Sequence, residues 1–350
     1  MTAFKCLTHV CKLVFVERSG WHYHRVKPAR RSRGATEHSN LTMPDSSTSK
    51  PTRTAAPKPL KGIRVLSLAL NLPGPAALMR CRELGAQCVK LEPPPPIDAL
   101  ANASGDPMSQ YSPQAYAALQ AGIRVRAADL KTEPGQRALH RELAQADVLL
   151  TSFRPSALAK LGLGWKALHK QYPRLSQVAI VGAPGALAEV PGHDLTYLAE
   201  NDLVTGLDLP ATLYADMGGA LMAVEAVLQT VIYKATKGKG VYLEVALSNA
   251  ANWLGLPRAW GLTKPGAAVG GGHAGYRVYA CKDGRVAVAA LEPHFAARLC
   301  EAAGVDGSKP QAMFDPQIHQ AIELFFLSQT RRQLESLAAK RDIPLHTLLN

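Results

Sequence analysis

The stretch that decides the fold is residues 63–92, IRVLSLALNLPGPAALMRCRELGAQCVKLE. Residues 63–70 form an apolar run with β-branched members, which is typical of a buried strand. Residues 76–85 have helical spacing and end at Gly85, and residues 87–92 form a second apolar run. A strand, a helix and a strand in so short a segment predict a parallel βαβ unit.

The same rhythm continues along the chain. We expect a strand near 123–130, a helix over 133–146, a strand at 147–153 and, after two short helices, a strand at 175–182. Strands that alternate with amphipathic helices indicate a parallel, Rossmann-like sheet. No GxGxxG follows the first strand, so a dinucleotide site is not predicted.

The pattern changes after a long helix predicted over 217–235. Residues 265–275, PGAAVGGGHAG, have the composition of a linker. Residues 276–291, YRVYACKDGRVAVAAL, predict a hairpin around the turn CKDG, and a helix is expected from Pro293. A hairpin followed by a helix is typical of a small α+β unit.

Three segments are therefore expected. The fold class is α/β, with a Rossmann-like parallel-sheet large domain over 60–264 and a second, smaller α+β domain over 265–350. Residues 1–59 hold +8 of the formal net charge of +13 and lack a signal-peptide layout. We expect them to be a disordered or wrongly assigned extension, with the true start at Met43.

Charge and composition limit the partners. The rest of the chain carries +5, which suits an anionic small molecule, and no nucleic acid partner is expected. The richest apolar run, 220–233, contains Glu225 and Gln229, so no membrane span or membrane partner is expected. The six cysteines form no CxxC pair and have no metal-ligand spacing, which predicts free thiols, a cytoplasmic location and no metal site.

Several motifs occur in a characteristic order. LKGIRVLSLALNLPGPAALMRCRELGAQCVKLEPP begins at residue 60 and DLKTEPGQRALHRELAQADVLLTSFRPSALAKLGLG spans 129–164, followed by PGHDLTYLA, YADMGGALMA, TKGKGVYLEVAL and AALEPHF. Over residues 60–349 this order resembles the family III CoA-transferases, which include formyl-CoA transferase, carnitine CoA-transferase and α-methylacyl-CoA racemase. The resemblance implies an enzyme that takes a CoA thioester as substrate, binds no permanent cofactor and forms a homodimer.

The resemblance also implies catalytic roles for three residues. Asp216, in the ADxxGG motif, matches the family's central acid, which is a nucleophile in the transferases and one of two bases in the racemases. His193, in the GHD motif, matches the second base of the racemases, and transferase members usually lack it. Glu292 is similar to the residue that orients that histidine.

The two chemistries use these residues differently. Exchange of the proton α to a thioester needs a base, an acid on the opposite face and a partner for the enolate oxygen. His193 and Asp216 would be base and acid, and the backbone amides of Met217, Gly218 and Gly219, expected at a helix start, would hold the oxygen. Alternatively, Asp216 attacks the thioester, and CoA moves between carboxylic acids through an aspartyl anhydride.

The CoA site is expected around the strand ends of the large domain. Phosphates need charge-assisted donors, but the usual LNRGKRS pattern of the family reads LQAGIRV at 119–125, where only the second arginine remains. The residues that we expect to bind CoA are Leu72, Pro73, Lys90, Arg124, Ser152, Phe153, Arg154 and Lys160.

Purely structural interpretations compete at the same positions. Asp216 and Asp194 each precede a predicted helix and would be ordinary N-caps, with the second helix starting at Leu195. His193 and Glu292 would be solvated surface residues.

Two departures from the family pattern motivate a third hypothesis. The interval from His193 to Asp216 is several residues shorter than in the racemases, and the small domain is expected to be truncated at its C-terminus. Together with the lost basic residues, this favours a degenerate, non-catalytic member of the family as a further alternative.

Overall fold

The computed structural model of the chain describes residues 56–96, 104–309 and 311–349. Residues 1–55, which make up most of the expected extension, lie outside these described residues. The boundaries at 264 and 265 between the two expected domains stay a prediction.

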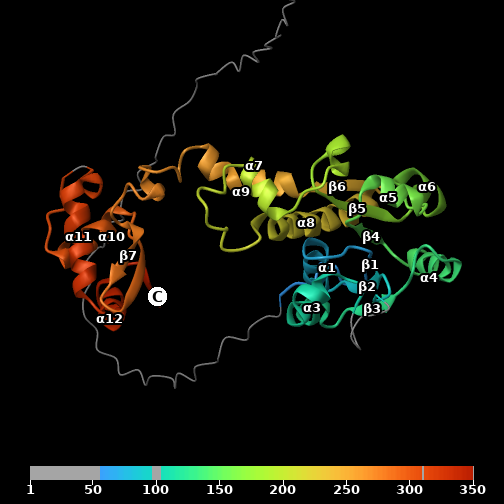
Figure 1. The fold of residues 1–350 in the computed structure, drawn as a ribbon, viewed down its shortest axis with the longest axis horizontal. Helices are drawn as coiled ribbons and strands as arrows, with labels where there is room; N and C mark the ends of the chain where they lie inside the picture. The colour runs from blue at the N-terminus through green and yellow to red at the C-terminus, as the bar shows by residue number, and fades with distance from the viewer. Residues whose placement is uncertain (1–55, 97–103, 310, 350) are drawn as a thin grey trace, which may run out of the picture. The chain divides into compact units, whose positions relative to one another are not determined.

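A six-stranded parallel sheet forms the centre of the larger part (Figure 1). Its strands are β1 (Arg64–Ser67), β2 (Gln87–Glu92), β3 (Arg124–Ala127), β4 (Val148–Thr151), β5 (Ser176–Val181) and β6 (Tyr242–Ala246). They lie in the order β3-β2-β1-β4-β5-β6, and every neighbouring pair is parallel. The predicted Rossmann-like sheet is confirmed, and its strand order reverses between β1 and β4.

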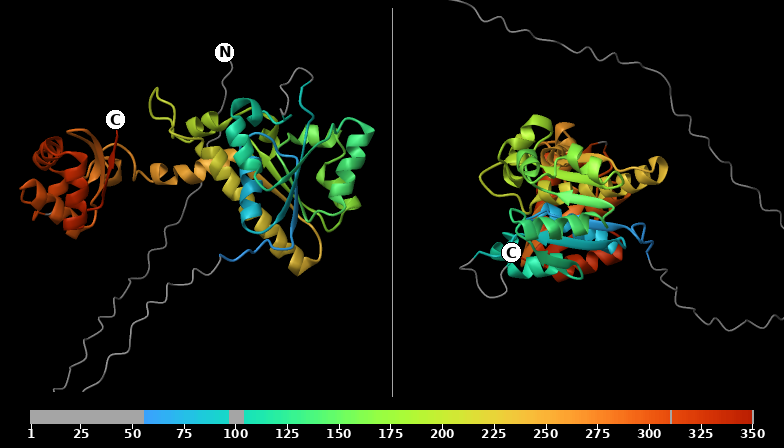
Figure 2. Two further views of the ribbon diagram at one scale, coloured as in Figure 1. Left: turned by 90° about the horizontal axis from the view of Figure 1, so that it is seen from below. Right: turned by 90° about the vertical axis from the view of Figure 1, so that its right-hand side faces the viewer.

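Helices cover both faces of this sheet (Figure 2). Because successive side chains of a strand point to opposite faces, Val65 and Leu66 belong to two different apolar clusters. The first cluster includes residues of α1 (Pro73–Glu83), α3 (Pro113–Gln120), α7 (Asp194–Glu200) and α8 (Tyr214–Lys237). The second includes residues of α4 (Glu133–Leu143), α5 (Pro155–Lys160) and α6 (Trp165–Gln171).

The long helix α8 packs against α1, α7, β5, β6 and α9 (Leu247–Ala259). It ends at Gly238, whose φ of 71° is the left-handed conformation that glycine adopts most easily. Within the described residues, α8 is the one helix long and apolar enough to cross a membrane. Its packing identifies it as a core helix of this fold, so no clear membrane span is present in the described part of the chain.

The C-terminal part holds a separate three-stranded antiparallel sheet. The predicted hairpin is confirmed as β7 (Tyr276–Cys281) and β8 (Gly284–Ala289), and β9 (Leu345–Leu348), which we did not predict, pairs with β8. One face packs on a core that includes Val286, Leu299 and Phe326. Three helices contribute to that core, namely α10 (Pro293–Ala303), α11 (Pro316–Ser328) and α12 (Arg331–Arg341). The predicted combination of α/β and α+β parts is confirmed.

Four short elements complete the described fold. They are the helix α2 (Met108–Tyr111) and the 3-10 turns η1 (Gly185–Glu189), η2 (Ala268–Gly270) and η3 (Ala312–Phe314).

Candidate active site

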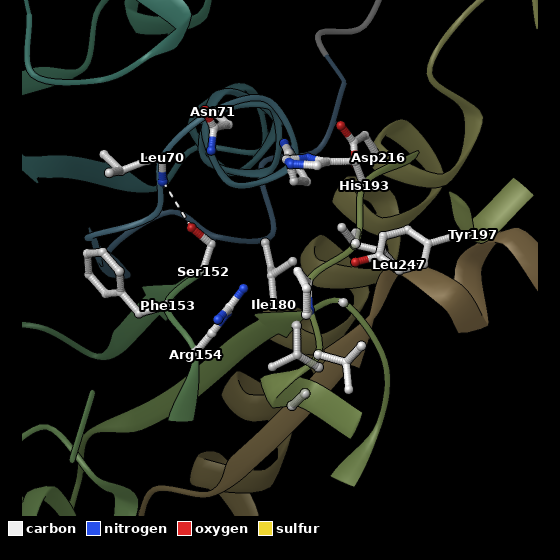
Figure 3. Close-up of a pocket in the computed structure, with 17 residues that line it drawn as sticks. Leu70, Asn71, Ser152, Phe153, Arg154, Ile180, His193, Tyr197, Asp216 and Leu247 are labelled. Atoms are coloured by element: carbon white, nitrogen blue, oxygen red, sulfur yellow. Dashed lines mark hydrogen bonds between the residues drawn. The ribbon is translucent and has the colours of Figure 1, made fainter. Parts of the chain in front are cut away.

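A cavity of about 190 Å³ lies beyond the carboxyl ends of β1, β4, β5 and β6 (Figure 3). In open α/β sheets, ligands bind at this edge, where the strand order reverses. Its polar lining includes Asn71, Ser152, Arg154, His193, Tyr197 and Asp216, and its apolar lining includes Ile180, Val190 and Leu247. The cavity therefore combines titratable groups with an apolar wall, as substrate sites commonly do.

A hydrogen bond joins the two loops at the point of strand reversal. The amide of Leu70, after β1, donates to the hydroxyl of Ser152, after β4, over 3.0 Å (Figure 3). The next residue, Asn71, has a φ of 63°, and its amide donates to Oδ1 of Asp106 over 3.0 Å. These bonds fix the backbone that borders the cavity on the β1 side.

His193 is the N-cap residue of α7 and is exposed. The hydroxyl of Thr196 accepts from the His193 amide over 3.1 Å and donates to its carbonyl over 2.7 Å. This fixes the backbone from which the imidazole reaches the cavity. The prediction that Asp194 caps this helix is wrong, because α7 begins at Asp194 itself.

The carboxylate of Asp194 caps a different helix. Asp194 is 5% exposed, and its Oδ1 accepts from the amide of Asp216 over 2.9 Å. The structural prediction that Asp216 is an N-cap is also wrong, since α8 begins at Tyr214 and Asp216 is its third residue. Asp194 therefore ties the start of α7 to the start of α8 and brings His193 and Asp216 to one cavity.

The pKa of Asp216 is raised from 3.8 to about 6. Burial is the main cause, because it penalises the charged form, and the negative charge of Asp194 adds to the rise. His193 acts in the opposite direction on this pKa, which agrees with the adjacent side chains in Figure 3. A carboxyl group with such a pKa can give or take a proton near neutrality.

Comparison with known proteins identifies the family. The family model for CoA-transferase family III matches residues 60–350. The chain belongs to CoA-transferase family III. One relative is the cinnamoyl-CoA:phenyllactate CoA-transferase of Clostridium sporogenes, to which the chain is 33% identical over 202 residues. The match covers 54% of this chain and 49% of that protein. It is 29% identical to the alpha-methylacyl-CoA racemase of Mus musculus over 268 residues, 71% of this chain and 66% of that protein.

The family III chain thus spans between 49% and 66% of the length of these two relatives. Crystal structures of Rv3272 from Mycobacterium tuberculosis and of a CAIB/BAIF family protein from Brucella suis superpose on it with a TM-score of 0.67 each. Their identities are 23% and 24%, and the matches cover 84% of this chain and 86% and 85% of those chains. At such identities the likeness shows the fold alone.

The cavity of this family III chain brings together six of the predicted site residues. They are Pro73, Ser152, Phe153, Arg154, His193 and Asp216. Leu72 packs against the core beside them, and Lys160, the last residue of α5, does not line the cavity. Glu292 is the N-cap residue of α10, outside the cavity lining, so its predicted action on His193 stays a prediction.

The prediction that Lys90 binds a CoA phosphate is wrong. Its side chain is fully buried, and its ammonium group pairs with Asp106 and, over 3.1 Å, with Glu92. A phosphate could reach it only by breaking this buried network. The prediction that Arg124 binds CoA finds no support either, since this residue does not line the cavity and pairs with Glu142 over 3.5 Å.

The predicted oxyanion amides of Met217, Gly218 and Gly219 are also in the wrong place. Because α8 begins three residues earlier than expected, the Met217 amide already donates to the Leu213 carbonyl over 3.1 Å. The two glycines follow inside the helix, where the regular ladder pairs their amides.

Sequence reasoning missed three residues of the site region. Asn71 and Tyr197 line the cavity, and Lys131 lines a neighbouring cavity of about 350 Å³ that shares Phe153. Tyr197 stands four residues after His193 in the PGHDLTYLA motif, and this closeness in the sequence was its signal. Asn71 and Lys131 carried no comparable pattern.

Proposed function

We propose that this family III chain is an acyl-CoA-processing enzyme that exchanges the proton α to the thioester of a 2-methylacyl-CoA. The observation that carries the proposal is the meeting of His193 and Asp216, from two helices, at one cavity on the ligand-binding edge of the sheet. The Asp216 pKa of about 6 supports it, since both protonation states are then accessible near neutral pH.

In this reaction the neutral imidazole of His193 removes the α-proton, and the carbonyl oxygen becomes an enolate. The carboxyl group of Asp216 then returns a proton from the other side of the planar carbon.

The CoA moiety would bind along the carboxyl ends of the strands. Arg154 lines the main cavity and Lys131 the neighbouring one, while Lys160 is the last residue of α5. These exposed cations offer charge-assisted donors to phosphate groups. Phe153 lies in the lining of both cavities and would separate the nucleotide from the acyl group.

The test is incubation with isobutyryl-CoA, a 2-methylacyl-CoA, in deuterated water. We expect mass spectrometry to show α-deuterium uptake by the wild type and a loss of about 10³-fold in the His193→Ala variant. His140→Ala is the matched control, because His140 is on α4, outside the cavity, and should leave the rate unchanged. Equal uptake by the wild type and His193→Ala would contradict the proposal.

The alternative is transfer of CoA between carboxylic acids, with Asp216 as nucleophile. Its support is the accessible, partly ionised carboxyl group at the cavity together with relatives named as CoA-transferases. Hydroxylamine added during turnover would trap an aspartyl adduct at residue 216, with no α-deuterium uptake. Absence of both signals in a folded protein that binds CoA would favour the non-catalytic alternative.

We also propose that the protein is a homodimer. Leu213, the N-cap residue of α8, and Met217 and Leu221 on the helix are spaced by four residues and are 45%, 41% and 63% exposed. Trp253 and Trp260 are 69% and 67% exposed. Exposed apolar surface of this kind is typical of interfaces. A second copy could then supply Glu292 to His193. Leu221→Glu should halve the mass measured by light scattering, and a monomeric wild type would contradict the proposal.

We propose that the protein is located in the cytoplasm. The four described cysteines are free and buried, which agrees with a reducing, cytoplasmic setting. No nucleic acid or membrane partner is proposed.

A further inference from the structure

Tyr197 lines the cavity, and the reaction proposed above does not use its hydroxyl group. The side chain is 5% exposed and lines the cavity together with His193 and Asp216. It is on α7, four residues after the N-cap residue His193, and both side chains line the same cavity. Figure 3 shows its hydroxyl directed toward the middle of the lining residues.

Two glycines leave the space that this hydroxyl occupies. A Cβ atom at Gly182 would lie 2.2 Å from the Tyr197 oxygen, and one at Gly192 would lie 2.6 Å from it. Neither glycine has a positive φ, so backbone conformation does not require glycine at these positions. The requirement comes from the tyrosine, whose hydroxyl is held between the end of β5 and the segment before His193.

The Tyr197 hydroxyl differs in its hydrogen bonding from the hydroxyls of Tyr279, which is buried, and Tyr116, which is half-buried. Tyr279 donates to the Ala274 carbonyl over 2.7 Å, and Tyr116 donates to Glu92 over 3.0 Å. Across the described residues, no hydrogen bond engages the Tyr197 hydroxyl. A tyrosine hydroxyl that reaches a cavity without a protein partner is available to an acceptor on a bound ligand.

The chemistry of the surroundings defines that acceptor. Burial and then the charge of Asp216 raise the pKa of Tyr197, so the hydroxyl keeps its proton and acts as a donor at neutral pH. A ligand that enters the cavity beside His193 and Asp216 can supply an oxygen as this acceptor. In an acyl-CoA this is the carbonyl oxygen, because it is bonded to the carbon next to the one that exchanges its proton.

We propose that Tyr197 donates a hydrogen bond to the thioester carbonyl oxygen of the bound acyl-CoA and stabilises the enolate oxygen. The inference rests on the proposed function. When His193 takes the α-proton, the C–H electron pair forms the C=C bond and the carbonyl π pair moves to oxygen. The Tyr197 proton stays on the tyrosine throughout, and Asp216 supplies the proton that restores the α-carbon.

The experiment compares the binding of two ligands that differ in this one oxygen. Isobutyryl-CoA carries the thioester carbonyl, and S-isobutyl-CoA, a thioether, lacks it. We expect the wild type to bind the thioester about 5- to 20-fold more tightly by calorimetry. The preference should fall to about twofold or less in Tyr197→Phe, which removes only the hydroxyl.

Tyr172→Phe is the matched control, because its hydroxyl bonds His140 over 2.9 Å, away from the cavity. It should keep the wild-type preference. An undiminished preference in Tyr197→Phe, or a wild type that binds both ligands equally, overturns the inference.

Binding separates this inference from the proposed function. A wild type that prefers the thioester through Tyr197 but incorporates no deuterium supports the hydrogen bond and contradicts the exchange reaction. If exchange occurs, its rate should fall about 10²- to 10³-fold in Tyr197→Phe, with KM changed less than threefold, since the bond strengthens as the oxygen becomes negative.

Discussion

Two groups of buried or half-buried polar side chains near the carboxyl edge of the large sheet differ in how fully they are hydrogen-bonded. In the first, the Lys90 ammonium pairs with Asp106 and Glu92, and the carboxylates accept further hydrogen bonds. In the second, no hydrogen bond or ion pair within the described residues engages the Asp216 carboxylate or the Tyr197 hydroxyl. The first group is satisfied by the protein itself, whereas the second leaves donors and acceptors for a ligand.

The difference teaches how to separate structural from functional polar residues. The carboxylate of Asp106 pairs with Lys90 and accepts hydrogen bonds from the amides of Asn71 and Met108, so it fixes the loop beside the cavity. Asp216 receives no such bonds, and burial raises its pKa instead. Removing a member of the satisfied group should therefore cost stability, and removing a member of the open group should cost mainly ligand binding or activity.

The largest effect is expected from Lys90→Met, which leaves two buried carboxylates without their cation. The free energy of unfolding should fall by about 3–5 kcal/mol in urea denaturation. Arg137→Met is the control, because Arg137 and Glu133 form an exposed pair whose loss should cost less than about 1 kcal/mol. Equal losses in the two variants would mean that the Lys90 group is not a satisfied buried network.

The next effect concerns the glycines around Tyr197. Gly182→Ala should lower the free energy of unfolding by about 1–3 kcal/mol, because its Cβ would collide with the tyrosine oxygen. Adding Tyr197→Phe should restore most of the loss, since the next nearest ring atom lies 3.2 Å from that Cβ. Gly164→Ala, where nothing lies within 4 Å, is the control. Failure of the double variant to recover would contradict the steric argument.

Asp216 should make the stability of the protein depend on pH. Its folded pKa of about 6 is above the usual 3.8, so ionisation costs more in the folded state, and the wild type loses stability as the pH rises from about 4 to about 6. Asp216→Asn cannot ionise. The free energy of unfolding of this variant, relative to that of the wild type, should rise by about 1–2 kcal/mol between pH 4 and pH 7. This amount is smaller than the full pKa shift would give, because solvent screens a partly exposed group. A constant difference across this range would show that the pKa is not raised.

The smallest effect is expected from Asp194→Asn. This variant keeps an oxygen that can accept from the Asp216 amide but removes the negative charge beside Asp216. The pH midpoint of the stability change should move down by less than about one unit, because burial, the main cause of the raised pKa, remains. An upward shift would contradict the assigned roles.

Much of the fold could be predicted from local patterns. Apolar runs alternating with helical spacing gave the parallel sheet and the hairpin, because strand and helix periods are properties of short segments. The missed elements include α3, α9, α11, α12 and β9. Residues 345–348 form a strand only because β8 offers a free edge for pairing.

The candidate site was predictable in part for the same reason. His193 and Asp216 were marked by ordered motifs, and both line the cavity. The error on the amides of α8 came from a helix boundary three residues away from its expected position. Boundaries are hard to place because caps and tertiary contacts, here the Asp194 carboxylate, decide where a helix begins.

The sequence by itself determined the alternation of strands and helices in the large domain, the family resemblance and the identity of the residues that could carry acid–base chemistry. Only the tertiary structure decided how each polar group is used. Lys90 and Arg154 are both cations close to predicted strand ends, yet one is buried against two carboxylates and the other lines the cavity. The physical reason is that burial, pKa and hydrogen-bond satisfaction depend on neighbours far apart in the chain, which no local pattern records.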